Sequence, residues 1–450
     1  MVPRMEPAIS VKGNDDSEDS GGKNRLDGTG PGRNGGYRVE HLQSALGICV
    51  IITLAWIFSE DRALFRWRMV VSALLLQLAI ALLLLKFPPA RAVLLGLNNL
   101  VNVLGTATTA GASFVFGYVG GGVTPFAVTN PRAMTSFAFG VLPLVIVISA
   151  LSALLWYWRI LPVIVGGIAY VLRRVLGLGG ATALASGATV FFGMIEAPLL
   201  IRPCLAKMTR TELFILFSVG LASVAGTMFV LYATVLKPVL PDALGHVLVA
   251  SMMALPGAVM IARIMVPGDA ATEEVPAKLE YRSSMDAVAK GTEDGLKIYL
   301  QIMALLIVMI ALISLADQIL AGLPNFMGAP LTLERVLGWL FAPLVWLYGV
   351  PWREAGVAGS LLGTKTILNE LVAYLKYAGL PKGALDPRSG LIMVYALCGF
   401  ANFGSVAILI AGMSALMPER RDEIVPLALR AIVSGTLASG LSASMIGLLT

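Results

Sequence analysis

Apolar segments long enough to cross a lipid bilayer dominate this chain of 450 residues. A membrane-spanning helix needs about 20 predominantly apolar residues. Hydrophobic residues make up 57% of the chain and charged residues only 13%, about half of the roughly 25% usual in a soluble domain. The sequence therefore predicts an all-α, polytopic membrane protein. Its eight expected spans lie near residues 42–58, 69–86, 137–158, 213–236, 244–262, 297–316, 391–416 and 424–449.

The same composition argues against several other classes of protein. The net charge of +6 is weak evidence for a nucleic-acid partner, because the basic residues of a membrane protein accumulate in its cytoplasmic loops and mainly indicate its topology. The cysteines Cys49, Cys204 and Cys398 lack CxxC spacing, so neither a disulfide framework nor a zinc site is expected. Only His41 and His246 could offer imidazole to a metal. Neither HExxH nor GxSxG occurs, so an enzyme is not expected.

The chain also divides by composition. Residues 1–40 are polar, contain no apolar run and predict a disordered tail, whose residues 2–4 resemble a protease-site remnant. The remainder divides into four segments according to where the expected spans and interruptions lie. Residues 41–136 and 244–335 each hold spans and an interfacial segment, residues 137–243 hold spans and a first interrupted region, and residues 336–450 hold a second interrupted region and the last spans.

Two further regions are apolar but interrupted. Segments 164–203 and 352–381 are rich in Gly and polar residues, and each contains an acid, Glu196 and Glu370 respectively. Non-helical backbone is tolerated at membrane depth only inside protein or along a wet cavity. We therefore expect two re-entrant hairpins, hairpin one at 164–203 and hairpin two at 352–381, in addition to interfacial helices and loops at 89–136 and 267–295.

The basic residues predict how the chain is oriented. The loop at 59–68 is short and basic, and the segments that lie inside when the tail is outside carry an excess of Arg and Lys. Both termini are thus expected outside, with hairpin one open to the cytoplasm and hairpin two to the exterior. Each half has the pattern of a hairpin with an acid, followed by a span broken by Gly and small polar residues. Such inverted repeats are typical of transporters with a midplane site.

Glu196 and Glu370 are the most informative residues. A carboxylate at the bilayer centre costs about 2.5–3.5 kcal/mol on insertion scales, so one that is present usually has a function. The alternative is an acid that only bonds helix ends. Asn369, Asn402 and Ser405 add donors and acceptors suited to a ligand rich in hydroxyls, although the last two could instead join helices across small residues.

Two other side chains are ambiguous. Phe400 could stack on a flat ring, but an aromatic residue in a span more often serves packing. Lys365 is expected to pair or to extend its amine toward the interface rather than to touch substrate.

Several stretches resemble the concentrative nucleoside transporter family. The resemblance runs from about residue 42 to the C-terminus. It is carried by FFGMIEAPLLIRP (191–203), LASVAGT (221–227), VLGWLFAPLVWLYGVPW (336–352), GTKTILNELVAY (363–374) and YALCGFANFGSVAILIAGMSALMPERR (395–421). The resemblance implies cation-coupled nucleoside uptake by elevator-like movement, a homotrimer, and a multi-pass protein of the bacterial inner membrane. It also implies that residues 41–136 and 244–335 belong to a scaffold, while residues 137–243, with hairpin one, and residues 336–450, with hairpin two and the last spans, form the two halves of a transport domain.

The resemblance also implies roles for individual residues. Asn369 and Glu370 match the ribose-binding pair, and Gly193 and Glu196 match the hairpin-one motif. The other matched positions are Phe400, Asn402 and Ser405 as further substrate contacts, Met194 and Ile195 at the nucleobase positions, and Thr189, Phe192, Ser223 and Val224 at a sodium site.

This chain departs from the family pattern in hairpin one. The family usually has Gln and Thr or Ser where Met194 and Ile195 stand here, and Asn where Thr189 stands. The nucleobase end is thus more apolar, and base preference is expected to be broad or shifted. Because Thr189 also changes the expected sodium site, coupling to protons through an acid is an alternative to sodium.

Other functions remain open. A modified nucleoside or another polar small molecule remains the alternative substrate. A channel and an intramembrane enzyme are less favoured, because of the paired broken hairpins and the absence of a protease-type acid motif.

Overall fold

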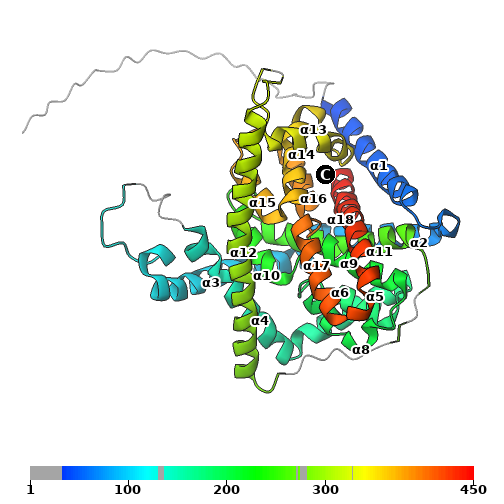
Figure 1. Cartoon of the computed structure of the whole chain (residues 1–450), viewed down its shortest axis with the longest axis horizontal. Helices are drawn as coiled ribbons and strands as arrows, with labels where there is room; N and C mark the ends of the chain where they lie inside the picture. Colours follow the sequence, from blue (N-terminus) through cyan, green and yellow to red (C-terminus); the bar gives the residue numbers. More distant parts are fainter. Residues whose placement is uncertain (1–32, 130–135, 270–271, 274–280, 327) are drawn as a thin grey trace, which may run out of the picture. The chain divides into compact units, whose positions relative to one another are not determined.

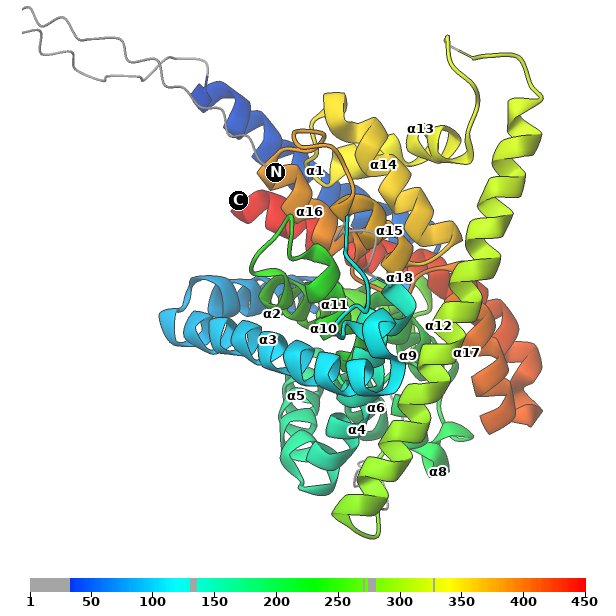
Figure 2. The same cartoon turned by 90° about the vertical axis from the view of Figure 1, so that its left-hand side faces the viewer.

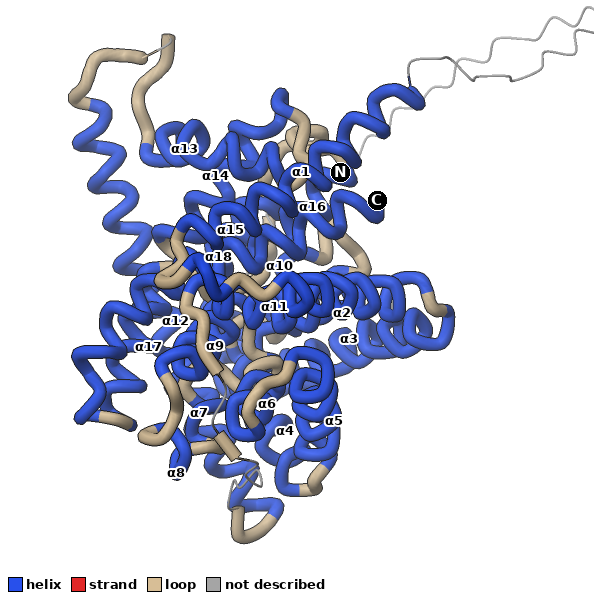
Figure 3. The backbone as a smooth tube through the Cα atoms, turned by 90° about the vertical axis from the view of Figure 1, so that its right-hand side faces the viewer, coloured by secondary structure: helices blue, strands red, loops and turns tan. Residues whose placement is uncertain are grey.

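The computed structural model describes residues 33–129, 136–269, 272–273, 281–326 and 328–450. Val39–Thr450 form one compact unit. Within the described ranges every regular element is a helix (Figure 3), apart from one isolated bridge between Phe326 and Ala329. The predicted all-α class is confirmed.

Helices α1 to α18 follow one another along the described chain. Residues 33–236 contain α1 Arg33–Ile57, α2 Trp67–Lys86, α3 Pro88–Phe116, α4 Pro143–Tyr157, α5 Ile160–Leu176, α6 Gly180–Ala188, α7 Glu196–Leu199, α8 Arg202–Leu205, α9 Arg210–Ala222 and α10 Gly226–Leu236. Residues 243–449 contain α11 Ala243–Met265, α12 Ser284–Ala321, α13 Leu333–Leu347, α14 Trp352–Ile367, α15 Glu370–Ala378, α16 Pro387–Leu397, α17 Phe403–Leu416 and α18 Arg421–Leu449. Short 3-10 and π turns add η1 Arg62–Leu64, η2 Gly117–Gly120, η4 Phe137–Val141 and η5 Pro418–Arg420.

Eight helices in the described part of the chain are long and apolar enough to cross a membrane. They are Glu40–Ile57, Trp67–Lys86, Pro88–Gly120, Phe137–Tyr157, Arg210–Leu236, Ala243–Met265, Ser284–Ala321 and Pro418–Leu449. Seven of the eight predicted spans correspond to one of these helices. The eighth, 391–416, is instead divided into α16 and α17, because the backbone leaves the helix between Cys398 and Asn402.

Three boundaries differ from the sequence prediction. The predicted interfacial segment 89–136 contains α3, which is long and apolar enough to span. The predicted interfacial segment 267–295 ends inside α12, whose helix starts at Ser284 because Ser283 caps it. Helix α1 starts at Arg33, inside the predicted disordered tail, and residues 1–32 of that tail lie outside the described residues.

Burial separates a central group of helices from peripheral ones. In the apolar part of α9–α10, 89% of the residues are buried inside the protein, and in that of α11 83% are buried. In the apolar part of α12 only 11% are buried. Helix α12 runs along one side of the molecule, and α2 and α3 lie across its direction (Figures 1 and 2). Helix α4, which the sequence assigns to the first transport half, packs chiefly along α12. The exposed faces of α3 and α12 are apolar, which suits contact with lipid or with another membrane-embedded surface.

Two interrupted helices cross at the centre of the molecule. The first is α9–α10, interrupted at Ser223–Ala225, and the second is α16–α17. The Phe400 N–H donates to the Ser223 carbonyl over 3.3 Å, so the two interruptions touch. Gly399 has φ +152°, and a β-carbon there would lie 2.6 Å from the Ala222 carbonyl oxygen. Only glycine permits this close approach.

We predict that Gly399→Ala destabilises the protein by about 1–3 kcal/mol, the usual cost of a strained backbone residue, with the steric clash adding to it. The measurement is thermal unfolding of the purified protein in detergent. Gly356→Ala in α14 is the control, because a β-carbon at Gly356 meets nothing within 4 Å. An equal melting temperature for wild type and Gly399→Ala would contradict the crossing geometry.

Glu60, in the loop between α1 and α2, joins that loop to two core helices. Its carboxylate accepts a hydrogen bond from Arg210, the first residue of α9, over 2.8 Å and also pairs with Arg430 of α18. The hydrogen bond from Arg210 is the main cause that holds the pKa of Glu60 below its ordinary value of 4.5. A lowered pKa means that the ion pairs stabilise the fold fully above about pH 4.5 and are lost as the pH falls through the folded-state pKa.

We therefore expect Glu60→Gln to melt at a lower temperature than wild type at neutral pH. The difference should shrink as the pH falls below the ordinary pKa of a glutamate, since the wild-type carboxylate is then protonated as well. Glu419→Gln serves as the control, because Glu419 has no ion-pair partner among the described residues. A difference that grows with acidity would refute the assignment.

Candidate functional site

A cavity of about 520 Å³ lies between the two interrupted helices, the starts of α7 and α15, and α12. Its volume is in the range of small-molecule sites. All nine residues that the sequence predicts as substrate contacts line it, so residues from both halves of the chain meet there. They are Gly193, Met194, Ile195, Glu196, Asn369, Glu370, Phe400, Asn402 and Ser405.

Glu370 is the centre of the polar end of this cavity. It is the first residue of α15 and only 4% exposed. Tyr232 of α10 donates to one carboxylate oxygen over 2.6 Å, and the Asn402 amide donates to the other over 3.1 Å. Each oxygen keeps a further lone pair. The carboxylate is thus held in place and can still accept hydrogen bonds from a ligand.

Asn369 and Asn402 each lie where a helix restarts after a non-helical stretch of backbone. The Asn369 side-chain oxygen accepts from the Val372 N–H over 2.9 Å and caps α15, and the Asn402 oxygen accepts from the Ser405 N–H over 2.7 Å and caps α17. Asparagine is a preferred N-cap because its oxygen satisfies a free N–H of the first turn. Asn369 also lines the cavity, so its amide nitrogen remains available to a ligand.

The segment predicted as hairpin one forms the apolar end of the cavity. Met194 packs against α9 where Gly220 leaves room, and Ile195 packs against α17 where Gly412 does so. A β-carbon at Gly193 would collide with the Glu196 carboxylate, which therefore folds back over this glycine. Met194 and Ile195 are therefore held by van der Waals packing against α9 and α17.

The predicted sodium-site residues also lie close together. Thr189, Ser223 and Val224 are buried, and the turn before Phe192 lies beside Gly226, with the Val190 and Phe191 carbonyl oxygens 3.3 and 3.2 Å from a β-carbon built there. The Thr189 hydroxyl donates to Ser186 and the Ser223 hydroxyl to Val219, which leaves both oxygens free to accept. Oxygen ligands are what hard cations prefer.

The structure corrects one expectation and adds one residue. Lys365 neither reaches toward an interface nor forms an ion pair with an acid among the described residues. It is completely buried and donates to the Ala396 carbonyl over 2.9 Å and to the Ser439 hydroxyl over 3.0 Å, and it does not line the cavity. Tyr232, the partner of Glu370, was missed by sequence reasoning. A single tyrosine in an apolar span has no pattern that sets it apart from a packing residue.

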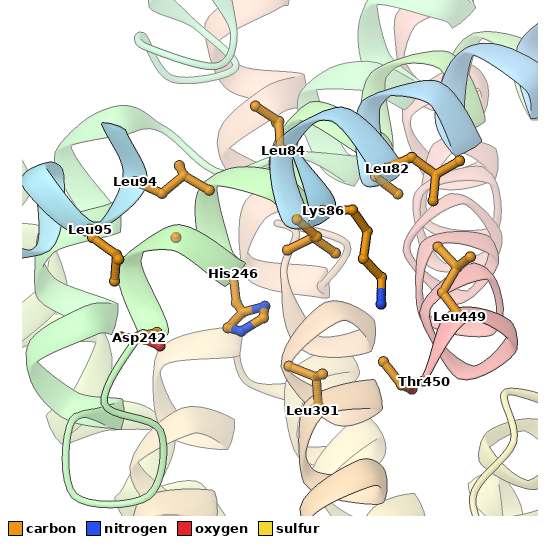
Figure 4. Close-up of a pocket in the computed structure, with 13 residues that line it drawn as sticks. Leu82, Leu84, Lys86, Leu94, Leu95, Asp242, His246, Leu391, Leu449 and Thr450 are labelled. Carbon is orange, nitrogen blue, oxygen red and sulfur yellow. The ribbon is translucent and has the colours of Figure 1, made fainter. Parts of the chain in front are cut away.

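A second cavity, of about 300 Å³, lies at the ends of α2, α11 and α18 (Figure 4). Lys86 points into it, between His246 and Leu449. The His246 ring is 3.2 Å from the Tyr395 hydroxyl. None of the nine predicted substrate residues lines this cavity, and much of its lining is leucine.

Comparison with known proteins places the chain in a family. Residues 46–119 and 246–447 match the N- and C-terminal parts described as Na+ dependent nucleoside transporter, and residues 138–239 match a segment described as nucleoside recognition. "Nucleoside permease NupC" of Helicobacter pylori is 34% identical over 90% of this chain and 97% of its own. The chain belongs to the concentrative nucleoside transporter family. Members of this family are membrane transporters and not enzymes.

Other relatives extend the likeness within the concentrative nucleoside transporters. "Uncharacterized transporter YutK" of Bacillus subtilis is 36% identical over 414 residues, 90% of this chain and 99% of that protein. CNTnw in an inward-facing substrate-bound state superposes with a TM-score of 0.83 at 36% identity, over 91% of this chain and 99% of that chain. A CNTnw variant in an outward-facing state gives a TM-score of 0.84.

We predict that Tyr232→Phe weakens ligand binding and lowers stability, because it leaves one buried oxygen of Glu370 without a donor, at a cost of about 1–3 kcal/mol. Ligand-induced thermal stabilisation measures both effects. Tyr348→Phe is the matched control, since the buried Tyr348 hydroxyl has no partner within the described residues. Identical behaviour of the two variants would show that the bond to Glu370 contributes nothing.

Proposed function

We propose that this protein is a secondary-active importer of nucleosides, driven by the inward movement of sodium or protons. The observation that carries the proposal is the buried Glu370 carboxylate, which faces the cavity beside the Asn369 and Asn402 amides. A carboxylate can accept from two neighbouring hydroxyls, and such charge-assisted bonds are strong. The two adjacent hydroxyls of a ribose fit this arrangement.

The other end of the cavity supports a broad or shifted base preference. Phe400 provides a ring against which a flat base can stack. Met194 and Ile195 provide packing but no hydrogen-bond donors, so a hairpin with these residues does not select strongly for polar groups on the base. This feature favours the second candidate substrate, a modified nucleoside or another polar small molecule that carries the same hydroxyl pair.

Two coupling routes are compatible with the residues present. Sodium would bind the hydroxyl and carbonyl oxygens of Thr189, Phe192, Ser223 and Val224. A proton would instead be carried on Glu196 or Glu370, since neutralising a carboxylate lowers the cost of moving it through the membrane. No carboxylate belongs to the first set, so the two routes use different residues and separate mutations test them.

We also propose elevator-type alternating access in a homotrimer of the bacterial inner membrane, with both termini outside. The mobile body would contain the two hairpins and the interrupted helices. The packing of α12 mainly along α4 supports a separate scaffold, and the apolar, exposed faces of α3 and α12 offer surfaces for other protomers or for lipid.

Glu370→Gln is expected to lower nucleoside uptake by about 100-fold or more, because two charge-assisted bonds to the sugar are weakened, each contributing about 1.5–3 kcal/mol. The measurement is uptake of labelled uridine into proteoliposomes, with unfolding followed in parallel. Glu334→Gln, at the exposed start of α13, is the control. Undiminished uptake by the Glu370 variant would refute the proposed sugar site.

The same assay tests the substrate and the coupling. Wild type should prefer uridine to 2′,3′-dideoxyuridine, and uptake should depend on sodium or on an acidic exterior. Ordinary pyrimidine selectivity with strict sodium dependence would contradict the altered base end and the proton alternative.

A further inference from the structure

One polar side chain of the substrate cavity comes from α12 rather than from a hairpin or an interrupted helix. The cavity-lining residues of α12 recur every three or four positions, so they form a single face of the helix. Within the described residues, Gln301 is the one polar member of that face. The cavity-lining residues of α12 are Ile298, Gln301, Ile302, Ala304, Leu305 and Val308.

The Gln301 amide is free to bind a ligand. Its side chain is exposed, and it has no hydrogen-bond partner among the residues that the structure describes. The other amides of the cavity are partly occupied, since the Asn369 and Asn402 oxygens cap helices. A free glutamine amide offers two donors and one acceptor. Gln301 thus has the most unused hydrogen-bonding capacity of the cavity-lining amides.

Its neighbours on α12 show where along the cavity Gln301 lies. Leu305 lies beside the start of α17, with its side chain 4.0 Å from a β-carbon built on Gly404. Asp294, two turns before Gln301, is near enough to Glu196 of hairpin one to act on its charge. Gln301 lies about 6 Å along the helix from Leu305, between the sugar end at Asn402 and the end formed by hairpin one.

In the proposed site, Gln301 lies where the nucleobase would lie, and Met194 and Ile195 of hairpin one offer that base no side-chain hydrogen bond. With the sugar hydroxyls on Glu370, the base extends toward Met194 and Ile195, which have no polar groups to offer. A polar base edge that faces these two side chains would be buried without a partner there, which is unfavourable. An amide from α12, which lines the same cavity, removes that cost.

We infer that Gln301 is a specificity-determining residue that hydrogen-bonds the polar edge of the nucleobase. The inference rests on the proposed nucleoside function and adds a contact supplied by α12. Because α12 packs along α4 rather than on the hairpins, the contact forms only when the hairpins lie beside α12. Base selection therefore depends on the position of the mobile body, while the sugar contacts move with the substrate.

The test compares two ligands that differ only at the base edge. Adenosine and benzimidazole riboside share the sugar and a similar flat base, but the second lacks the polar edge. Ligand-induced thermal stabilisation of the purified full chain gives their relative affinities. We expect Gln301→Leu to weaken adenosine about 3- to 10-fold, as for the loss of a neutral hydrogen bond, and to leave benzimidazole riboside unchanged or tighter.

Gln318→Leu is the matched control, since Gln318 is a second glutamine of α12 and lines a different cavity. It should change neither affinity. The inference is overturned if Gln301→Leu weakens both ligands equally, if it weakens neither, or if wild type does not distinguish them. If wild type binds no nucleoside at all, the proposed function fails and the inference fails with it. If wild type binds both ligands and Gln301→Leu behaves as wild type, only the inference fails.

Discussion

The need to bury the Glu370 carboxylate inside a membrane protein determines much of the central structure. An ionised acid at that depth is tolerated only with donors around it. Tyr232 and Asn402 supply them from two different interrupted helices. The acid, the hydroxyl and the amide lie on three segments that are far apart in sequence. They meet only because the helices are interrupted where they cross.

The crossing in turn depends on small residues and on backbone groups that bond outside their own helix. The Phe400 N–H reaches the Ser223 carbonyl, and Gly399 allows the second backbone to approach the end of α9. Asn369 and Asn402 cap the helices that restart after a break. These bonds satisfy some of the backbone groups that each break frees, as a non-helical backbone inside a membrane protein requires. The freed groups that face the cavity are the ones available to substrate or ion.

The two ends of the cavity are built differently. The end at Glu370 consists of charged and polar side chains that hold one another, whereas the end at hairpin one is filled by Met194 and Ile195 against glycines of α9 and α17. A rigid polar end and an apolar end allow strong selection for hydroxyls with weak selection at the base. In the proposed site, an amide such as Gln301 on α12 would restore part of that selection without changing the contacts at Glu370.

The sequence by itself determined the helical class, the apolar spans and the family, because span length, low charge and the motifs around Glu196 and Glu370 are local in the chain. It also predicted that nine residues would share a site as substrate contacts, and all nine line one cavity. Only the tertiary structure decided that the span predicted at 391–416 is broken, that Pro88–Phe116 form one continuous helix, and that Lys365 is buried. It alone also showed that Tyr232 bonds Glu370 and that Gln301 lines the cavity. Local hydropathy cannot distinguish a continuous helix from an interrupted one, nor a packing tyrosine from one that bonds an acid. Both depend on neighbours far away in sequence, which only the packed structure brings together.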